Sequence, residues 1–86
     1  MATVKTVKMT DTDAVIGQFL VLWRNEMKQP AKITDVDKAA QRIKYEVVGG
    51  PDKGKKYSSR FDTGQTVNVY DEENVMLALL ETGGSN

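Results

Sequence analysis

The densest group of side chains able to bind a partner is a short basic stretch in the second half of the chain. Four cationic residues occur within eight positions with no acidic residue among them: Lys53, Lys55, Lys56 and Arg60. Cations at this density suit the phosphates of a nucleic acid, and Tyr57 beside them can stack on a base. We predict a nucleic-acid or partner-binding surface here, extended by Lys32 and Lys44.

Other kinds of chemistry are excluded by what the 86 residues lack. The chain has no His and no Cys, which removes disulfide scaffolds, Cys nucleophiles, His general bases and zinc sites built from thiolates or imidazoles. Residues 49–56 resemble a phosphate-binding P-loop, but Lys56 stands where that motif needs Ser or Thr. We therefore predict that the protein is not an enzyme and takes no cofactor.

Carboxylates are the only remaining ligands for a metal ion, and they suit a hard cation. They occur as a pair, Asp35 and Asp37, and as a cluster at residues 71–73. Turn and helix-cap roles account for both groups. We predict no metal site.

The net charge of zero conceals a separation of charge along the chain. Twelve basic residues balance twelve acidic ones, yet all twelve basic residues lie in residues 1–61 and none in residues 62–86. The first part carries a net charge of +5 and the second −5. This distribution predicts a directed docking surface with which the protein binds a larger protein complex, as in a small accessory or regulatory protein, for instance one of phage type. Nucleic-acid binding through residues 53–60 is the alternative.

The length fits one small domain, which we place at residues 1–81 with a disordered tail at 82–86. No apolar run approaches the roughly 20 residues of a membrane span, and the first residues lack the apolar stretch of a signal peptide. The expected setting is the cytoplasm, with the protein a monomer or a weak homodimer.

Five segments carry the pattern of β-strands, at residues 3–9, 31–36, 42–48, 57–61 and 66–70. The second and third are predicted to form a hairpin, and residues 49–56 a loop. Residues 13–28 fit either a helix capped by Asp13 or a strand buried on both faces. Residues 71–81 fit a helix, or a 3₁₀ turn before a last strand. As a helix they would bury Val75, Met76, Leu79 and Leu80, whereas partial exposure would mark a dimer or partner interface.

Several short motifs occur in the order found in SH3-like barrels of the Tudor type. They are Leu22 and Trp23 at the end of a strand, Ala-Lys-Ile before an acidic turn at residues 31–37, Phe-Asp-Thr-Gly at 61–64 and Glu-Glu-Asn-Val at 72–75. Over residues 20–79 the chain resembles these modules. The resemblance implies a mostly β fold, a small barrel of about five antiparallel strands with a short C-terminal helix or 3₁₀ turn. The alternative is an α+β fold, with helices at 13–28 and 71–81 on a three- or four-stranded antiparallel sheet.

Tudor-type modules often bind methylated Lys or Arg in an aromatic cage, which uses cation–π attraction. The resemblance makes three residues candidates for an aromatic surface: Trp23, Tyr45 and Phe61. The chain departs from the family at Lys28, Gln29 and Pro30, where aromatics are common, and in an insertion at residues 49–59.

Overall fold

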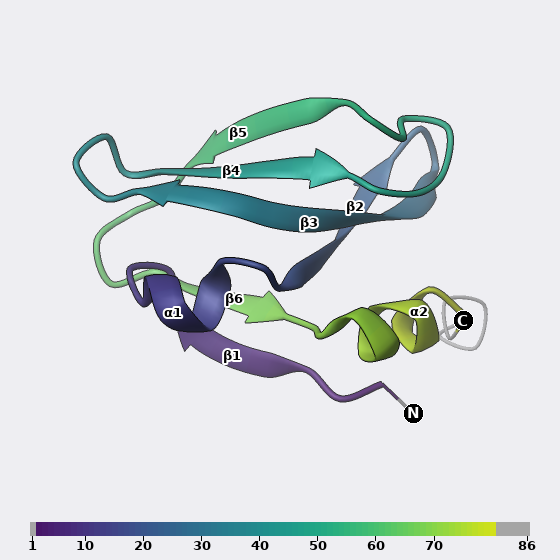
Figure 1. Cartoon of the computed structure of the whole chain (residues 1–86), viewed down its shortest axis with the longest axis horizontal. Helices are drawn as coiled ribbons and strands as arrows, with labels where there is room; N and C mark the ends of the chain where they lie inside the picture. Colours follow the sequence, from purple (N-terminus) through teal and green to yellow (C-terminus); the bar gives the residue numbers. More distant parts are fainter. Residues whose placement is uncertain (1, 81–86) are drawn as a thin grey trace.

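Six strands in two antiparallel sheets, with two short helices, make up the fold of this computed structural model, which describes residues 2–80 (Figure 1). In chain order the elements are β1 (Lys5–Lys8), α1 (Thr12–Val15), β2 (Phe19–Arg24), β3 (Met27–Asp37), β4 (Arg42–Val47), β5 (Lys56–Arg60), β6 (Thr66–Val69) and α2 (Glu72–Leu80). One sheet pairs β1 with β6, and the other has the order β2-β3-β4-β5. The mostly β prediction is confirmed.

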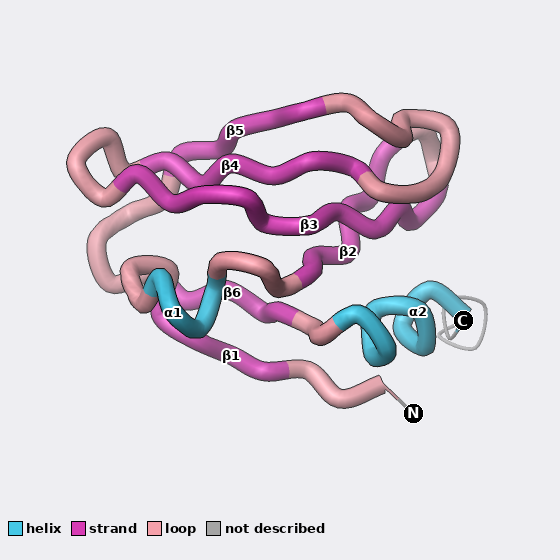
Figure 2. Tube along the Cα trace, in the orientation of Figure 1, coloured by secondary structure: helices cyan, strands magenta, loops and turns pink. Residues whose placement is uncertain are grey.

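Among residues 2–80 a single β-bridge joins the two sheets. The Phe19 N–H donates to the Tyr70 carbonyl at 2.8 Å, and the Tyr70 N–H donates to the Phe19 carbonyl at 2.9 Å. The four-stranded sheet lies over β1, β6 and α1, with the apolar interior between them (Figure 2). Within residues 2–80 no pairing of β5 with β1 closes the sheets into a barrel.

The segment at residues 13–28 is mostly strand. Helix α1 ends at Val15, and Gly17 has φ +88°, which redirects the chain into β2. The strand alternative is therefore confirmed for β2, and a helix over residues 13–28 is wrong. Asp13 lies inside α1 rather than before it, since the N-cap position belongs to Asp11.

A two-residue turn joins β2 to β3 and sets their register. Asn25 and Glu26 both have positive φ, +53° and +62°, as in the type I′ turns that match the twist of a hairpin. Trp23 consequently lies opposite Lys28, and Phe19 opposite Lys32.

Strand β3 contains a β-bulge that directs two of its residues into the core. Ile33 pairs with Tyr45 and Val36 with Ile43, and the register shifts between Ile33 and Asp35. Side chains three positions apart would face opposite sides of a regular strand, so the extra residue lets both Ile33 and Val36 become buried. The predicted hairpin and the following loop are confirmed.

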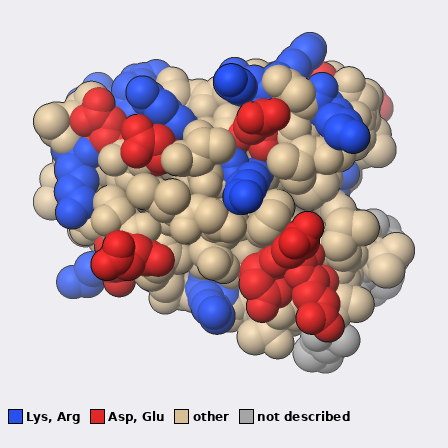
Figure 3. Space-filling model, viewed as in Figure 1, with Lys and Arg blue, Asp and Glu red and all other residues tan. Residues whose placement is uncertain are grey.

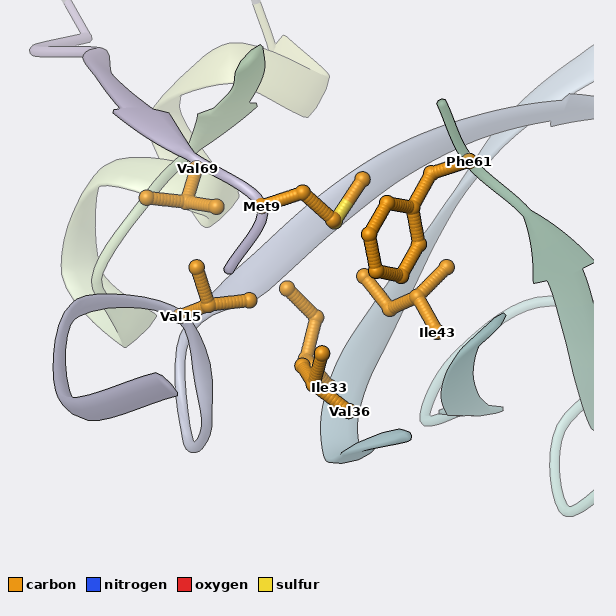
Figure 4. Packing of buried hydrophobic residues seen from close by; sticks show 7 residues of the cluster. All are labelled: Met9, Val15, Ile33, Val36, Ile43, Phe61 and Val69. Atoms are coloured by element: carbon orange, nitrogen blue, oxygen red, sulfur yellow. The ribbon is translucent and has the colours of Figure 1, made fainter. Parts of the chain in front are cut away.

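The hydrophobic core draws on both sheets and α1 (Figure 4). Its buried members are Met9, Val15, Ile33, Val36, Ile43, Phe61 and Val69. Phe61 is only 2% exposed, so its prediction as part of an aromatic surface is wrong. The Phe61 N–H donates to the Gln41 carbonyl at 2.9 Å as the chain leaves β5, and the ring lies beside Met9 and Ile43 in Figure 4.

Helix α2 confirms the helix alternative for residues 71–81 but not the buried stripe predicted for it. Asp71 caps it, because its Oδ1 accepts the Asn74 N–H at 2.8 Å. Val75 is buried, whereas Met76 is 56% and Leu80 81% exposed. The helix packs against β2 and β3 and lies beyond the end of β6, below the hairpin end of the four-stranded sheet in Figure 1. Glu81 and the predicted tail at 82–86 lie outside the described residues.

In the part of the chain that the structure describes, neither helix is long and apolar enough to cross a membrane.

Candidate functional site

A groove of about 1030 Å³ lies between α2 and the β2–β3 hairpin. The sheet contributes Phe19, Trp23 and Pro30, and the helix contributes a second set, Val75, Met76 and Leu79. Val48, Gly49 and Gly50, which follow β4, close the far end. The groove thus brings together four segments that are distant in sequence.

Several large apolar side chains of this groove are in contact with solvent. Trp23 is 69% exposed, and Met27 at the hairpin end and Val48 after β4 are also exposed. Together with Met76 they form an apolar surface on one side of the molecule. Contiguous apolar surface of this kind usually marks a binding site.

Charged residues of both signs surround the groove. Lys28 and Lys32 come from β3. They lie opposite Trp23 and Phe19 of β2, and therefore on the same face of the sheet. Glu26 and Glu72 lie at the turn and at the start of α2; the acidic first turn of α2 forms part of the red cluster at the lower right of Figure 3. Among residues 2–80 the ion pairs within 4.0 Å both involve Asp52, so Lys28 and Lys32 have their charge available.

A buried polar network ties the loop after β4 to the β2–β3 hairpin. Gln29 is fully buried, and its Nε2 donates to Asp52 Oδ2 at 3.1 Å and to the Arg24 carbonyl at 3.2 Å. Its Oε1 accepts the Asp52 N–H at 3.1 Å, and Asn25 Nδ2 donates to Asp52 Oδ2 at 2.8 Å. A Cβ at Gly50 would lie 3.0 Å from the Gln29 side chain. The network therefore fixes the end of the groove that Gly49 and Gly50 form.

The same network lowers the pKa of Asp52. Burial by itself raises this pKa, but the hydrogen bond from Gln29, the hydrogen bond and charge of Lys55 and the charge of Arg24 together lower it below the ordinary aspartate value. Lys55 Nζ lies 3.3 Å from Asp52 Oδ1, and Arg24 Nε lies 3.8 Å from Oδ2. The native state consequently favours the charged carboxylate.

We expect acid to destabilise the protein partly through Asp52. Because the folded-state pKa is below the unfolded-state pKa, the unfolded chain binds the proton more readily. The contribution is fully present above about pH 4 and is lost as the pH falls through the lower, folded-state value. Urea unfolding midpoints of the wild type and Asp52→Asn, measured across this range, should converge as the pH falls. A constant difference between the two proteins would contradict this role.

The structure separates the predicted basic residues into several places. Lys44, Lys56 and Tyr57 line a hollow of about 370 Å³ together with Tyr45, whose ring centroid is 6.1 Å from that of Tyr57. Outside this hollow, Lys32 lines the main groove, Lys55 pairs with Asp52, Lys53 is exposed in the loop, and Arg60 lies opposite Arg42 at the other end of β5. The predicted single basic surface is thus divided.

The aromatic residues do not converge either. Trp23 lines the main groove, Tyr45 lines the smaller hollow and Phe61 is in the core. The guanidinium of Arg24 lies 4.3 Å from the centre of the Tyr57 ring, a cation–π contact within the protein itself. Within residues 2–80 no group of three or more carboxylates is placed to hold a metal ion.

Sequence reasoning missed the Gln29–Asp52 network and most of the groove. Gln29 carries no pattern that distinguishes it from an exposed strand residue. The one available signal for the groove was the α2 stripe, whose partial exposure indicates an interface.

Comparison with protein-family models, curated proteins and solved structures gives no match to this chain. The likeness to SH3-like, Tudor-type modules therefore stays a prediction from the sequence motifs.

Proposed function

We propose that this protein is a non-catalytic binding module that docks onto a partner protein through the groove between α2 and the β2–β3 hairpin. The observation that carries the proposal is the apolar lining itself, since Trp23 is 69% and Met76 56% exposed in one groove. Buried aromatic anchors contribute most of the energy of many protein interfaces. The fitting occupant is a segment of the partner with apolar side chains for the groove and carboxylates for Lys28 and Lys32.

Two observations favour a protein over a nucleic acid as the partner. The groove is mainly apolar, whereas nucleic-acid sites rely on cations placed along a backbone. The positive charges of Lys55 in the basic loop and of Arg24 at the end of β2 face the carboxylate of Asp52, which reduces the attraction that this loop can exert on phosphates. An SH3-like, Tudor-type relation is part of the proposal, supported by the antiparallel meander and the motif order, because such modules bind protein or nucleic-acid partners.

The proposal predicts that a charge at Met76 weakens binding. As a probe we choose dodecapeptides selected from a random phage-displayed library on the immobilised protein. Met76→Glu should weaken the selected peptides at least about tenfold, because it places a carboxylate among apolar contacts. Leu77→Glu is the matched control, since Leu77 is exposed on the same helix but does not line the groove. Trp23, the chain's one tryptophan, reports occupancy through a blue shift of its fluorescence.

Other results would contradict groove docking. Equal peptide affinity for wild type and Met76→Glu, or no change in Trp23 emission, would place the binding site elsewhere. A gel shift with single-stranded oligonucleotides tests the nucleic-acid alternative. Binding by the wild type that is lost in a Lys44→Ala and Lys56→Ala double variant would favour that alternative.

A further inference from the structure

The outer edge of β2 has backbone groups without a strand partner. Arg24 and Met27 close a two-residue hairpin, so they form a hydrogen-bonded pair, and such pairs alternate along antiparallel strands. Leu20 and Leu22 consequently bond to β3, while Phe19, Val21 and Trp23 direct their N–H and C=O groups outward. Phe19 bonds to Tyr70 on that side. Beyond this bridge no strand of residues 2–80 pairs with the outer edge of β2.

The other edge of the sheet, β5, differs in chemistry. The Phe61 N–H donates to the Gln41 carbonyl and the Val47 N–H to the Lys55 carbonyl. By the same alternation, the β5 residues whose backbone N–H and C=O groups point away from β4 are Lys56, Ser58 and Arg60. All three side chains are exposed. Lysine and arginine at an edge are a common protection against unwanted strand pairing. The outward residues of β2 are Val21 and Trp23, which give no such protection.

The unprotected edge borders the proposed binding groove, because Trp23 belongs to both. We propose that the partner segment binds in extended form, as a β-strand added along β2. This proposal rests on the proposed function, in which the groove is the docking site. Val21 and Trp23 would supply the backbone hydrogen bonds. Alternate side chains of the added strand would then fall on the groove side, toward Met76 and Leu79 of α2.

The two lysines on the β3 side of the groove favour a segment that carries a carboxylate over a second copy of this protein, while Glu26 and Glu72 lie at the turn and at the start of α2. Lys28 and Lys32 are available on the groove side. If the β2 strand of another copy paired with this edge, it would place Arg24 near the two lysines. It would supply no carboxylate, since residues 19–24 contain no Asp or Glu. The fitting occupant is an extended segment of a partner protein in which apolar residues alternate, with at least one Asp or Glu among them.

The pattern of the selected dodecapeptides tests the mode of binding. An added strand should enrich apolar residues at every second position, together with Asp or Glu. Apolar residues spaced by three and four positions would indicate a bound helix; that result would overturn strand addition while leaving groove docking intact. Peptides whose binding is unaffected by Met76→Glu would instead overturn the groove proposal.

A pair of proline variants tests the backbone contribution directly. Val21→Pro removes an outward N–H and leaves the β3 pairing, because proline is tolerated on an edge where the N–H faces away from the sheet. It should weaken peptide binding at least about tenfold. Ser58→Pro makes the same change on the β5 edge and should leave binding unchanged. Equal affinities for the two variants would overturn strand addition.

Amide hydrogen exchange on the unaltered protein makes the test independent of proline tolerance. Addition of a selected peptide should slow exchange at Val21 and Trp23 and leave Ser58 unchanged. Unchanged exchange at Val21 and Trp23 would overturn the proposal. Sedimentation of the free protein should show a monomer, and a dimer that Val21→Pro dissociates would identify a second copy as the occupant instead.

Discussion

Replacing Phe61 with alanine should lower the free energy of unfolding by about 3–5 kcal/mol, the usual cost of removing a buried aromatic ring. Phe61 is 2% exposed and packs in the core cluster with Met9 and Ile43. Small domains are typically stable by only about 5–15 kcal/mol, so this variant should lose a large part of its stability. Urea unfolding followed by far-ultraviolet circular dichroism measures the change.

The matched control for Phe61→Ala is Trp23→Ala, because both residues were candidates for one aromatic surface. Trp23 is 69% exposed, and its replacement should change the free energy of unfolding by no more than about 0.5 kcal/mol. Peptide binding in the groove should instead be lost. A Trp23→Ala variant destabilised as strongly as Phe61→Ala would show that Trp23 is part of the core.

Gln29→Leu should lower the free energy of unfolding by about 2–3 kcal/mol. Leucine keeps most of the volume at this fully buried position but removes both hydrogen bonds that join Gln29 to Asp52 and the one to Arg24. The Asp52 N–H is then left without its side-chain partner. Thermal or urea unfolding measures the loss.

Gln65→Leu serves as the control for Gln29→Leu. Gln65 Oε1 accepts the Asp62 N–H at 2.9 Å, but this residue is exposed, so water can replace the lost bond. We expect a loss of about 0.5–1 kcal/mol. Equal losses for the two variants would mean that the Gln29–Asp52 network has no special weight. Gln29→Leu should also raise the pKa of Asp52, since it removes a hydrogen bond to the carboxylate.

The sequence predicted the elements that have a single apolar face. Residues 42–48 alternate, and residues 42–47 form β4. The acidic residues before Asn74 fit a helix start, one of the two alternatives for residues 71–81, and α2 begins at Glu72. Residues 19–23 are apolar without interruption because β2 contacts the core on one side and the groove on the other. Periodicity cannot distinguish such a segment from a buried helix.

The hairpin turn shows a second limit. Type I′ turns favour Asn-Gly, and Glu26 at φ +62° is an uncommon choice. The strongest local signal for a hairpin was therefore absent between β2 and β3. Without that turn, the pairing of Trp23 with Lys28, which places both at the groove, could not be deduced.

The candidate site was harder to predict because it depends on contacts between distant segments. The basic loop was correctly predicted as a loop. One of its positive charges, that of Lys55, forms an ion pair with Asp52, three residues earlier in the chain. The groove takes residues from β2, β3, residues 48–50 and α2. Whether Met76 is buried or exposed depends on the groove that α2 forms with β2 and β3, and the sequence of α2 does not contain that information.

The pairing of β1 with β6 has a consequence for chain entropy. Val7 pairs with Val67, so this sheet closes a loop of about sixty residues, whereas the turn between β3 and β4 is closed by residues 38–41. Loop-closure entropy costs about 0.6 kcal/mol for each doubling of length, so joining β1 to β6 costs roughly 2 kcal/mol more than that turn. The four-stranded sheet is built from short-range hairpins. The β1–β6 sheet, by contrast, depends on the core packed between the two sheets. Burial of Met9 and Val69 in that core offsets the entropy cost of closing the long loop.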